Sequence, residues 1–409
     1  MSKIFVQYGA GNIGRGFIGA LFSQADYEVK FIDVVPEVIE LLNRDHCYPI
    51  KIVDNEKSES ILIQNVSAIN GLEQAEVAEA IASADMMATS VGVNILPRII
   101  SNLLAGFRLR WSKGNMQPLN IIICENLLDA DKFMHKLFFE QMNENEKVLF
   151  EKTIGLVEAS IGRMVPVMTQ EAKQENPLGV WVERYGQLPI DKAAFKGEAP
   201  TIANLVPFSP FEYYIRRKLF VHNMGHALSA YLGNIIEETT IWQAMSNPYV
   251  KIIVERAMLE SAIALSKEFG VPLPIIRENI TDLLLRFANF ALGDTVARVG
   301  KDTTRKLSEN DRFVGAMNLC LKQGVLPIYI CIGIAAAFYF SDSKTEIADT
   351  LLREQSIIDV LHTHCKIEDS QIVDMIFIFY NDLQENDLAQ VLESAEAFEK
   401  AELSKKIII

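Results

Sequence analysis

The residues best suited to chemistry lie in one short segment, "KLFVHNMGHAL", which spans residues 218 to 228. The segment is otherwise apolar and helix-forming, yet it carries Lys218, His222, Asn223 and His226. At about 100° per residue these four side chains occupy one side of an α-helix, and the apolar residues between them form the opposite side. Because solvated helix faces usually carry Glu, Lys and Gln, the pattern favours a helix that lines a cleft over a solvated polar stripe.

Lys218 is the candidate general base. Burial lowers the pKa of a lysine because a low-dielectric environment disfavours the ammonium form, and an amine with a pKa near neutrality accepts protons efficiently. His226 is expected about 12 Å further along the helix axis, a distance that a lysine side chain and a small substrate together span. Gly225 falls beside Lys218 on the same face, where the missing side chain is expected to leave room. The segment therefore predicts acid–base chemistry on a small molecule.

A second candidate site is the glycine loop in "FVQYGAGNIGRGFIG", where GxGxxG spacing follows a predicted strand and opens a helix. Glycines at these positions allow a tight turn and a close approach of the backbone to a pyrophosphate, toward which the helix N-terminus directs its N–H groups. Asp33 ends the next strand, where a carboxylate accepts hydrogen bonds from the adenosine ribose hydroxyls. The predicted cofactor-binding residues are Gly9, Gly11, Asn12, Ile13, Gly14 and Asp33.

The same carboxylate bears on the choice of cofactor. Asp33 would repel the additional phosphate of NADP, so the sequence favours NAD. Arg15 and Lys30 lie nearby in the sequence and keep NADP open as an alternative, because an arginine can compensate for a 2′-phosphate. A glycine turn with a purely structural role is the remaining alternative.

The elements around these sites indicate an α/β fold. Up to about residue 200, short apolar runs alternate with helical stretches, which is the pattern of a parallel sheet covered by helices. The polar sequence "NEKS" joins the runs 48–54 and 59–66 into a predicted hairpin, and 180–186 is predicted to be a late strand. The predicted strands of the parallel sheet are 3–8, 29–33, 85–91, 120–124 and 153–161.

A change of pattern near residue 200 indicates a second domain. From there the sequence has long helices with a 3.6-residue period, one of which is predicted to end at Gly270. A chain of 409 residues also exceeds the size at which single cores stop growing. We therefore predict a Rossmann-type dinucleotide-binding domain over 1–198 and a mostly helical substrate domain over 199–409.

Composition limits the partners. A formal net charge of -14 argues against binding to nucleic acid and to an anionic membrane surface. Five cysteines without CxxC spacing fit a reducing compartment, and the N-terminus lacks the features of a signal peptide, so we expect a cytoplasmic protein. Residues 324–340 are uncharged, but Pro327 and the amphipathic helices around them favour a buried core helix over a membrane span. A monomer is one assembly that the sequence allows.

The spacing of Lys218, Asn223 and His226, K-x4-N-x2-H, resembles the signature of the polyol-specific long-chain dehydrogenases and reductases. The resemblance implies that Lys218 is the general base and that His226 orients the substrate or supports the lysine. It also implies that Asn223 and Asn126 donate hydrogen bonds to the developing alkoxide. Other segments similar to this family are "GAGNIGRGFIG", "ICEN" (123–126), "GRMVP" (162–166), "RVGKDTTRKLSENDR" (298–312) and "GIAAAFYF" (333–340).

The resemblance further implies the reaction: NAD-dependent hydride transfer between D-mannitol 1-phosphate and D-fructose 6-phosphate. No metal is expected, because the lysine ammonium and the amide pair replace a Lewis acid, and the histidines of "HTHC" (362–365) do not share a helix face. One alternative is a related reductase of an unphosphorylated polyol or a hexuronate. The other is a dinucleotide-sensing protein without catalytic activity.

The candidates for binding a sugar phosphate are Arg217, Arg298 and Arg305. Arg298, Lys301 and Arg305 fall close to one face of a predicted helix, although an exposed basic face paired with Asp302 and Glu309 is the alternative. Arg217, just before the candidate base, can form bidentate bonds to a phosphate. The role of His222 stays open between electrostatic tuning of the lysine and packing as a neutral side chain.

Overall fold

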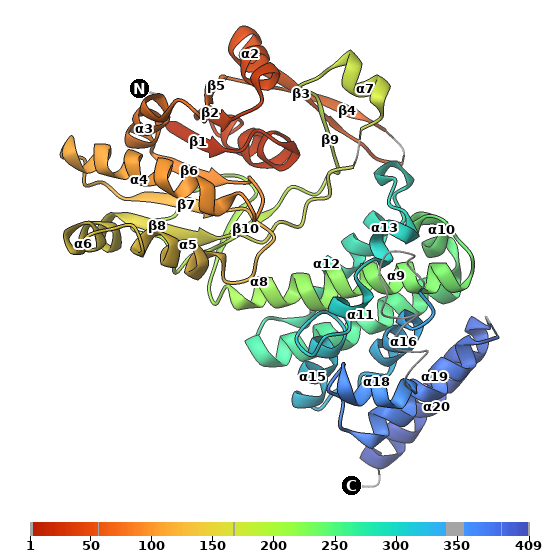
Figure 1. Ribbon diagram of the computed structural model, residues 1–409. Helices are drawn as coiled ribbons and strands as arrows, with labels where there is room; N and C mark the ends of the chain where they lie inside the picture. The colour runs from red at the N-terminus through yellow and green to blue at the C-terminus, as the bar shows by residue number, and fades with distance from the viewer. Residues whose placement is uncertain (1–2, 56, 167, 341–355, 386, 408–409) are drawn as a thin grey trace. The chain divides into compact units, whose positions relative to one another are not determined.

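The computed structural model describes residues 3–55, 57–166, 168–340, 356–385 and 387–407. The chain divides into two compact units, Met1–Tyr214 and Ile215–Ile409. The predicted α/β first part and helical second part are confirmed (Figure 1).

The first unit is built on a six-stranded parallel sheet. Its strand order is β5-β2-β1-β6-β7-β8, and every neighbouring pair is parallel. The five predicted strands are all present, whereas β5 was not predicted as a member of this sheet. The strands are β1 (Ile4–Tyr8), β2 (Glu28–Asp33), β5 (Val66–Asn70), β6 (Met86–Thr89), β7 (Leu119–Ile123) and β8 (Ile154–Glu158).

Helices cover both faces of this sheet, which explains why its strands are so apolar. The consecutive residues Phe5 and Val6 of β1 are both fully buried, and they belong to two different hydrophobic clusters on opposite faces. One face carries η1 (Gly14–Gly19), α1 (Ala20–Ser23) and α2 (Pro36–Asp45). The other carries α3 (Gln74–Ser83), α4 (Leu96–Ser112), α5 (Ala130–Phe139) and α6 (Glu144–Thr153).

A smaller sheet packs against the first of these faces. The predicted hairpin is confirmed as the antiparallel pair β3 (Cys47–Ile52) and β4 (Glu59–Gln64). The predicted late strand is β9 (Val180–Val182), which pairs in parallel with β3. Short helix α7 (Gln170–Glu175) precedes β9.

The end of the first unit differs from the predicted division at residues 198 and 199. Strands β10 (Leu188–Asp191) and β11 (Leu205–Phe208) form a two-stranded parallel sheet. This pairing keeps the segment around β11 with the first unit, and the division lies between Tyr214 and Ile215.

The described part of the second unit is helical. The longest helix, α11 (Pro248–Phe269), ends at Gly270 in the left-handed conformation, as predicted. Helix α16 (Ile328–Ala337) is buried over its whole length, which confirms the predicted core helix. The others include α9 (Met224–Ile235), α10 (Ile241–Ser246), α12 (Leu273–Phe287), α13 (Val296–Gly300), α14 (Thr303–Lys306), α15 (Val314–Lys322), α18 (Ile357–Thr363), α19 (Ser370–Leu383) and α20 (Leu388–Ile407).

Within the described ranges, we find no helix that combines the length and the apolar character needed to cross a membrane.

Candidate active site

Two of the three glycines in the loop after β1 are required by the protein's own packing. Gly9 has φ of +96°, and a Cβ there would lie 2.5 Å from the carbonyl oxygen of Ser90. A Cβ on Gly14 would lie 2.0 Å from the carbonyl oxygen of Gly9. The loop is thus folded back on itself and against the chain that follows β6, and any larger residue at either position would open it.

Gly11 has no such internal reason to be glycine. No protein atom lies within 4 Å of a Cβ built there, and its φ is not in the left-handed region. Gly11 and Asn12 are exposed, and Ile13 packs against the core beneath. An open space beside a glycine loop at the carboxyl end of β1 is what close approach of a pyrophosphate requires. The residues of the loop therefore fit a dinucleotide.

Asp33 ties the end of β2 to this loop. Its Oδ2 accepts a hydrogen bond from the Ala10 N–H at 2.7 Å, and its Oδ1 accepts from the N–H groups of Val34 (2.7 Å) and Val35 (3.0 Å). A carboxylate offers about four lone-pair positions, so roughly one is left for a ribose hydroxyl. Asp33 thus shapes the loop in addition to offering the predicted ribose contact.

Arg15 and Lys30, the two cations for which the sequence allowed NADP as the cofactor, both have partners within the protein. Arg15 is buried and donates hydrogen bonds to the carbonyl oxygens of Ala10 and Leu178, and desolvation lowers its pKa. Lys30 pairs with Glu28 at 3.3 Å. Both cations are therefore already bound to groups of the protein, which disfavours a role in binding a 2′-phosphate. The charge beside the loop is that of Asp33.

Asn126 lies at the same edge of the sheet, in an exposed bend after β7. The residue before it, Glu125, is buried, and its two carboxylate oxygens accept hydrogen bonds from the N–H groups of Val91 and Gly92, both at 2.8 Å. Glu125 therefore joins the loop after β6 to the bend that carries Asn126. Sequence reasoning missed this residue, although an acidic side chain directly after a fully buried strand was a usable signal.

In the second unit, Lys218 lies in a π-helical turn. Helix α8 (Glu212–Arg217), the π-turn η2 (Lys218–Asn223) and α9 follow one another without a gap, and the junction residues Arg217, Asn223 and Met224 have helical backbone angles. The prediction of α-helical geometry from residue 218 onward is therefore wrong for the first six residues. A π-turn has more residues per turn than an α-helix, so the assumed 100° per residue does not apply to Lys218, His222 and Asn223. Such turns occur frequently at functional sites.

The apolar side of this helix is packed as predicted, but Gly225 has a different role. Phe220, Val221 and Met224 are buried. A Cβ on Gly225 would lie 2.6 Å from the Sδ atom of Met258 in α11. The glycine thus allows close packing of α9 on α11, and the expectation that it leaves room beside Lys218 is wrong.

Lys218 has the electrostatic character of a base. Desolvation by burial lowers its pKa to about 8, and the positive charge of Arg312 contributes to the shift. The Arg312 side chain is itself nearly buried and donates from Nε to Asp311 Oδ1 at 2.8 Å. An amine with this pKa is substantially neutral in mildly alkaline solution and can then accept a proton.

His226 is held by a carboxylate and an aromatic ring. Its Nε2 atom lies 3.2 Å from Asp294 Oδ2, and its ring stacks on Phe287 with centroids 4.9 Å apart and an interplanar angle of 10°. Desolvation lowers its pKa to about 3, and nearby cations, Arg298 first, act in the same direction. Because Arg298 also pairs with Asp294, the carboxylate does not hold the imidazole in its charged form. His226 is neutral at physiological pH.

His222 is the packed neutral histidine of the two alternatives. Its ring lies 5.8 Å from the Phe287 ring and 6.3 Å from that of His226, centroid to centroid. Desolvation lowers its pKa well below the ordinary value, and neighbouring cations including Arg286 act in the same direction. A neutral imidazole carries no charge with which to tune Lys218. Asn223, next along the turn, is half-buried.

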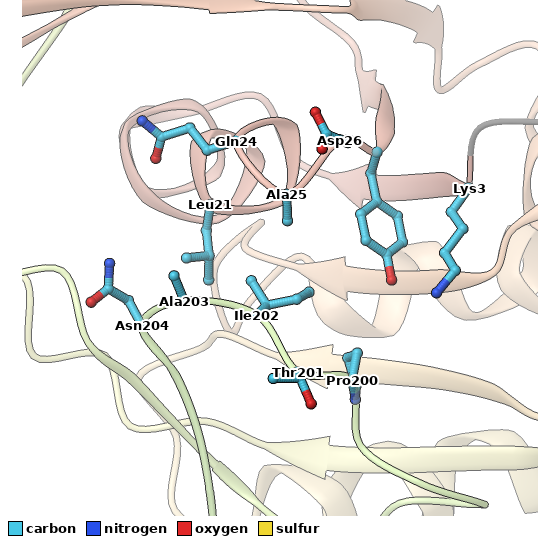
Figure 2. A pocket seen from close by; sticks show the side chains of 11 residues that line it. Lys3, Leu21, Gln24, Ala25, Asp26, Pro200, Thr201, Ile202, Ala203 and Asn204 are labelled. Atoms are coloured by element: carbon cyan, nitrogen blue, oxygen red, sulfur yellow. The ribbon is translucent and has the colours of Figure 1, made fainter.

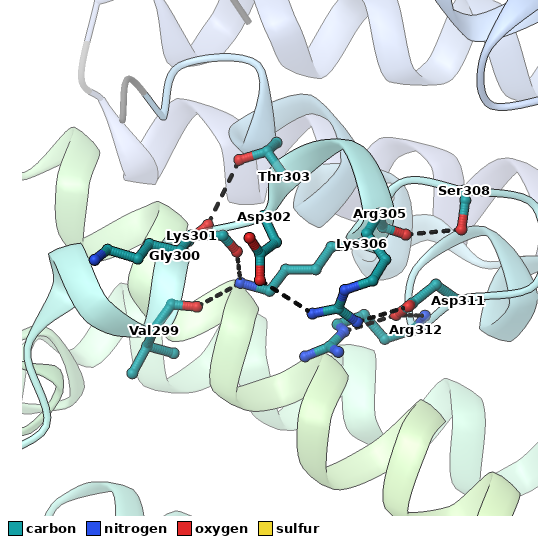
Figure 3. Close-up of polar contacts among 10 residues, drawn as sticks. All are labelled: Val299, Gly300, Lys301, Asp302, Thr303, Arg305, Lys306, Ser308, Asp311 and Arg312. Atoms are coloured by element: carbon teal, nitrogen blue, oxygen red, sulfur yellow. Dashed lines mark hydrogen bonds and ion pairs between the residues drawn. The ribbon is translucent and has the colours of Figure 1, made fainter. Parts of the chain in front are cut away.

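The predicted basic helix face of residues 298 to 305 is not formed, because the helix breaks in the middle. Helix α13 ends at Gly300, Asp302 adopts a left-handed conformation with φ of +59°, and α14 starts at Thr303 (Figure 3). Arg305 pairs with Asp311 at 3.0 Å and with Asp302 at 3.5 Å, and Arg298 pairs with Asp294. Each arginine therefore has a carboxylate partner.

The same segment contains a buried lysine that sequence reasoning missed. The ammonium of Lys306 donates hydrogen bonds to the carbonyl oxygens of Val299 (2.6 Å) and Lys301, across the helix break (Figure 3). Desolvation lowers its pKa to about 8, and Arg312 acts in the same direction. Arg217, at the end of α8, is half-buried, and its charge contributes to the low pKa of His222.

The first unit also contains a cavity of about 540 Å³ (Figure 2). Lys3 comes just before β1 and Tyr27 just before β2, so the cavity opens at the amino-terminal edge of the sheet. The glycine loop and Asp33 lie at the carboxyl-terminal edge. The cavity is therefore separate from the candidate cofactor site. It is lined by Lys3, Leu21, Gln24, Ala25, Asp26, Tyr27, Pro200, Thr201, Ile202, Ala203 and Asn204.

In the part of the chain that the structure describes, no group of three or more His, Cys, Asp or Glu side chains has an arrangement that could hold a metal ion. Of the "HTHC" histidines, His364 bonds through Nε2 to the carbonyl oxygen of Thr304 at 3.0 Å.

The fold and these two sites define an oxidoreductase with a Rossmann-type first domain and a helical second domain. The chain belongs to the mannitol dehydrogenase family: the family's Rossmann-domain model matches residues 3–204, and its C-terminal-domain model matches residues 211–401.

Relatives named mannitol-1-phosphate 5-dehydrogenase support this assignment. The protein of Brevibacillus brevis is 35% identical over 360 residues, which cover 87% of this chain and 92% of the relative. The protein of Geobacillus stearothermophilus is 36% identical over 368 residues, which cover 89% and 95%.

Two solved structures have the same fold. A D-sorbitol dehydrogenase in substrate-free form has a TM-score of 0.76 at 12% identity, covering 97% of this chain and 95% of its own. The mannitol 2-dehydrogenase of Pseudomonas fluorescens, in a ternary complex with NAD and D-mannitol, has a TM-score of 0.68 at 14% identity, covering 98% and 94%.

Proposed function

We propose that this protein is an NAD-dependent dehydrogenase that interconverts D-mannitol 1-phosphate and D-fructose 6-phosphate. The observation that carries the proposal is Lys218, a half-buried lysine with a pKa lowered to about 8, in one helical segment with Asn223 and His226. The two bacterial relatives at 35% and 36% identity carry the name of this activity. The open space beside Gly11 and the carboxylate of Asp33 support binding of a dinucleotide that has no 2′-phosphate.

In the direction of oxidation, neutral Lys218 takes the proton from the C5 hydroxyl of the polyol. The C5–H bond breaks, and the hydrogen leaves with both electrons as hydride, so that C5 becomes the C2 carbonyl of the ketose. Bound NAD supplies the nicotinamide ring that accepts this hydride. In the reverse direction the Lys218 ammonium returns the proton to the new hydroxyl.

Hydrogen bonds stabilise the negative charge that develops on the reacting oxygen. Asn223 and Asn126 carry amide N–H groups that donate to the alkoxide, and the Lys218 ammonium adds a positive charge. These groups supply the polarisation that a bound metal supplies in other dehydrogenases, so the proposed reaction is independent of a metal. Neutral His226 orients the substrate by a hydrogen bond to a neighbouring hydroxyl.

The phosphate of the substrate requires cations outside this set. Arg217, Arg298 and Arg305 are the candidates, because guanidinium groups form bidentate bonds to phosphate. Arg298 and Arg305 would bind the phosphate while they keep their present carboxylate partners, Asp294 and Asp311.

The test is a substrate panel followed by the absorbance of the reduced cofactor. Fructose 6-phosphate with NADH is expected to give the highest kcat/KM, and NADPH a much lower one. Preference for fructose, fructuronate or tagaturonate would replace the proposed substrate by an unphosphorylated one. Binding of NADH without turnover of any panel member would favour a dinucleotide-sensing protein instead.

A further inference from the structure

Asp294 lies in the short connection between the 3₁₀ turn η3 (Phe290–Leu292) and α13, and its backbone is fixed on both sides. Its carbonyl oxygen accepts a hydrogen bond from the Ile241 N–H at 2.9 Å. The next residue, Thr295, forms an antiparallel bridge with Thr240, and its hydroxyl oxygen accepts from the Arg298 N–H at 3.2 Å, which caps α13. The carboxylate of Asp294 therefore projects from an anchored piece of backbone.

This carboxylate is the polar partner of His226. Its side chain is only 12% exposed, and Oδ2 lies 3.2 Å from His226 Nε2 while Oδ1 contacts the Arg298 guanidinium. Phe287 stacks on the imidazole ring and fixes its plane. Stacking alone leaves the position of the ring proton undefined, because either nitrogen of a neutral imidazole can carry it.

We propose that Asp294 is a positioning residue, which holds neutral His226 as the Nε2–H tautomer so that its Nδ1 lone pair accepts a hydrogen bond from a substrate hydroxyl. A carboxylate only accepts hydrogen bonds, so the 3.2 Å distance between Asp294 Oδ2 and His226 Nε2 favours a proton on Nε2. The guanidinium of Arg298 balances the charge of Asp294, which lets the carboxylate orient His226 without protonating it. The role of Nδ1 rests on the proposed function, whereas the tautomer does not.

The decisive variant is Asp294→Asn. An asparagine at this site would give its oxygen to Arg298, which needs an acceptor, and would turn its NH₂ group toward His226. Nε2 must then accept, and the proton moves to Nδ1. The same type of change in a Ser-His-Asp triad costs ~10⁴-fold in kcat through the wrong tautomer. Because His226 orients the substrate and is not the base, we expect a loss of about 10- to 100-fold in kcat.

A readout that does not depend on turnover is the ¹⁵N spectrum of the imidazole. In ¹⁵N-histidine-labelled protein, two-bond ¹H–¹⁵N correlations distinguish Nε2–H from Nδ1–H, and His226→Gln identifies the signal among the six histidines. We expect Nε2–H in the wild type, Nδ1–H in Asp294→Asn, and Nε2–H restored in Asp294→Glu.

The matched control is Asp282→Asn. Asp282 pairs with Arg286 four residues further along at 3.3 Å, as Asp294 pairs with Arg298, but it makes no contact with His226 in the described structure. The Asp282→Asn substitution is expected to leave both the His226 tautomer and kcat unchanged. NADH affinity and thermal melting of each variant show that the protein is folded.

The outcomes separate cleanly. An Nε2–H tautomer that persists in Asp294→Asn overturns the inference, even if activity falls, because the loss then comes from freeing Arg298. A tautomer that moves as expected in a protein that turns over no polyol or ketose supports the role of Asp294 and removes the proposed function. A folded Asp294→Asn variant with the moved tautomer and wild-type kcat also overturns the catalytic part of the inference.

Discussion

The glycine loop of the first unit and the Lys218 site of the second unit handle charge in opposite ways. In the first, the carboxylates of Asp33 and Glu125 are each held by two or more backbone N–H groups, at distances of 2.7 to 3.0 Å. In the second, cations are crowded together, and burial lowers the pKa of both Lys218 and Lys306 to about 8. The first arrangement fixes the conformation of the loops. The second lowers the proton affinity of the lysines.

The difference extends to what each site costs the fold. Backbone N–H groups satisfy the carboxylates near the glycine loop, so these groups stabilise the loops that they join. A desolvated ammonium such as that of Lys218 disfavours the folded state, because its charged form loses hydration. A charged group that destabilises the fold and lies in a cluster of polar groups is typical of a functional site.

The largest effect is expected from Lys218→Met. Loss of the base should lower turnover by about 10²- to 10⁴-fold, while NADH affinity, measured by fluorescence titration, should stay unchanged. The variant should also melt at a higher temperature. The pKa of Lys218 is lower in the folded state than in the unfolded state, so its destabilising effect is fully present below about pH 8 and fades toward pH 10.5.

The control for this prediction is Lys322→Met, which removes an exposed lysine paired with Glu268 at 2.8 Å on α15. It should change neither turnover nor NADH affinity. Turnover in Lys218→Met within a few fold of the wild type would remove the assignment of the base and with it the contrast between the two sites.

Two alanine substitutions test whether the glycine loop is defined by shape. Gly14→Ala places a Cβ against the Gly9 carbonyl oxygen, so it should lower the free energy of unfolding by about 1–3 kcal/mol or more and abolish NADH binding. Gly11→Ala meets no protein atom, so its stability should stay within ~0.5 kcal/mol of the wild type. It should nevertheless weaken NADH binding about tenfold, equivalent to ~1.4 kcal/mol.

Differential scanning calorimetry and NADH titration measure both effects. If Gly11→Ala bound NADH as tightly as the wild type, the open space beside the loop would not be where the dinucleotide lies. If Gly14→Ala were as stable as the wild type, the loop would be more adaptable than its packing indicates.

The comparison also explains how much of the molecule could be predicted from the sequence. The requirements of the glycine loop are local: Gly9 and Gly14 meet each other within six positions, and Asp33 ends the next strand. Alternating apolar runs and helical periods likewise predicted five strands of the central sheet and the hairpin. Strand β5 escaped because "VSAIN" is short and follows the hairpin after a single residue, Asn65.

The Lys218 site could be predicted only in part. The residue types were visible in the sequence, but the π-turn at Lys218 and the helix break at Asp302 depend on packing between distant segments. Asp294 is 68 positions from His226 in the sequence. The carbonyl oxygens that Lys306 binds become available as acceptors because the helix is broken there. Spacing along one helix does not encode contacts of this kind.

The smallest expected effect is a shift in pH dependence caused by Arg312→Gln. Neutral Lys218 is needed for oxidation of the polyol, so that rate should rise with pH through a midpoint near 8, and ketone reduction, which needs the ammonium, should fall through the same midpoint. Arg312 contributes to the lowered pKa of Lys218 by repulsion, so its removal should move both midpoints upward. Burial, the larger cause, stays in place, which limits the shift to less than about one pKa unit. Arg312→Lys keeps the charge and should keep the wild-type midpoint; a downward shift in Arg312→Gln would show that the crowding of cations does not set the proton affinity of the base.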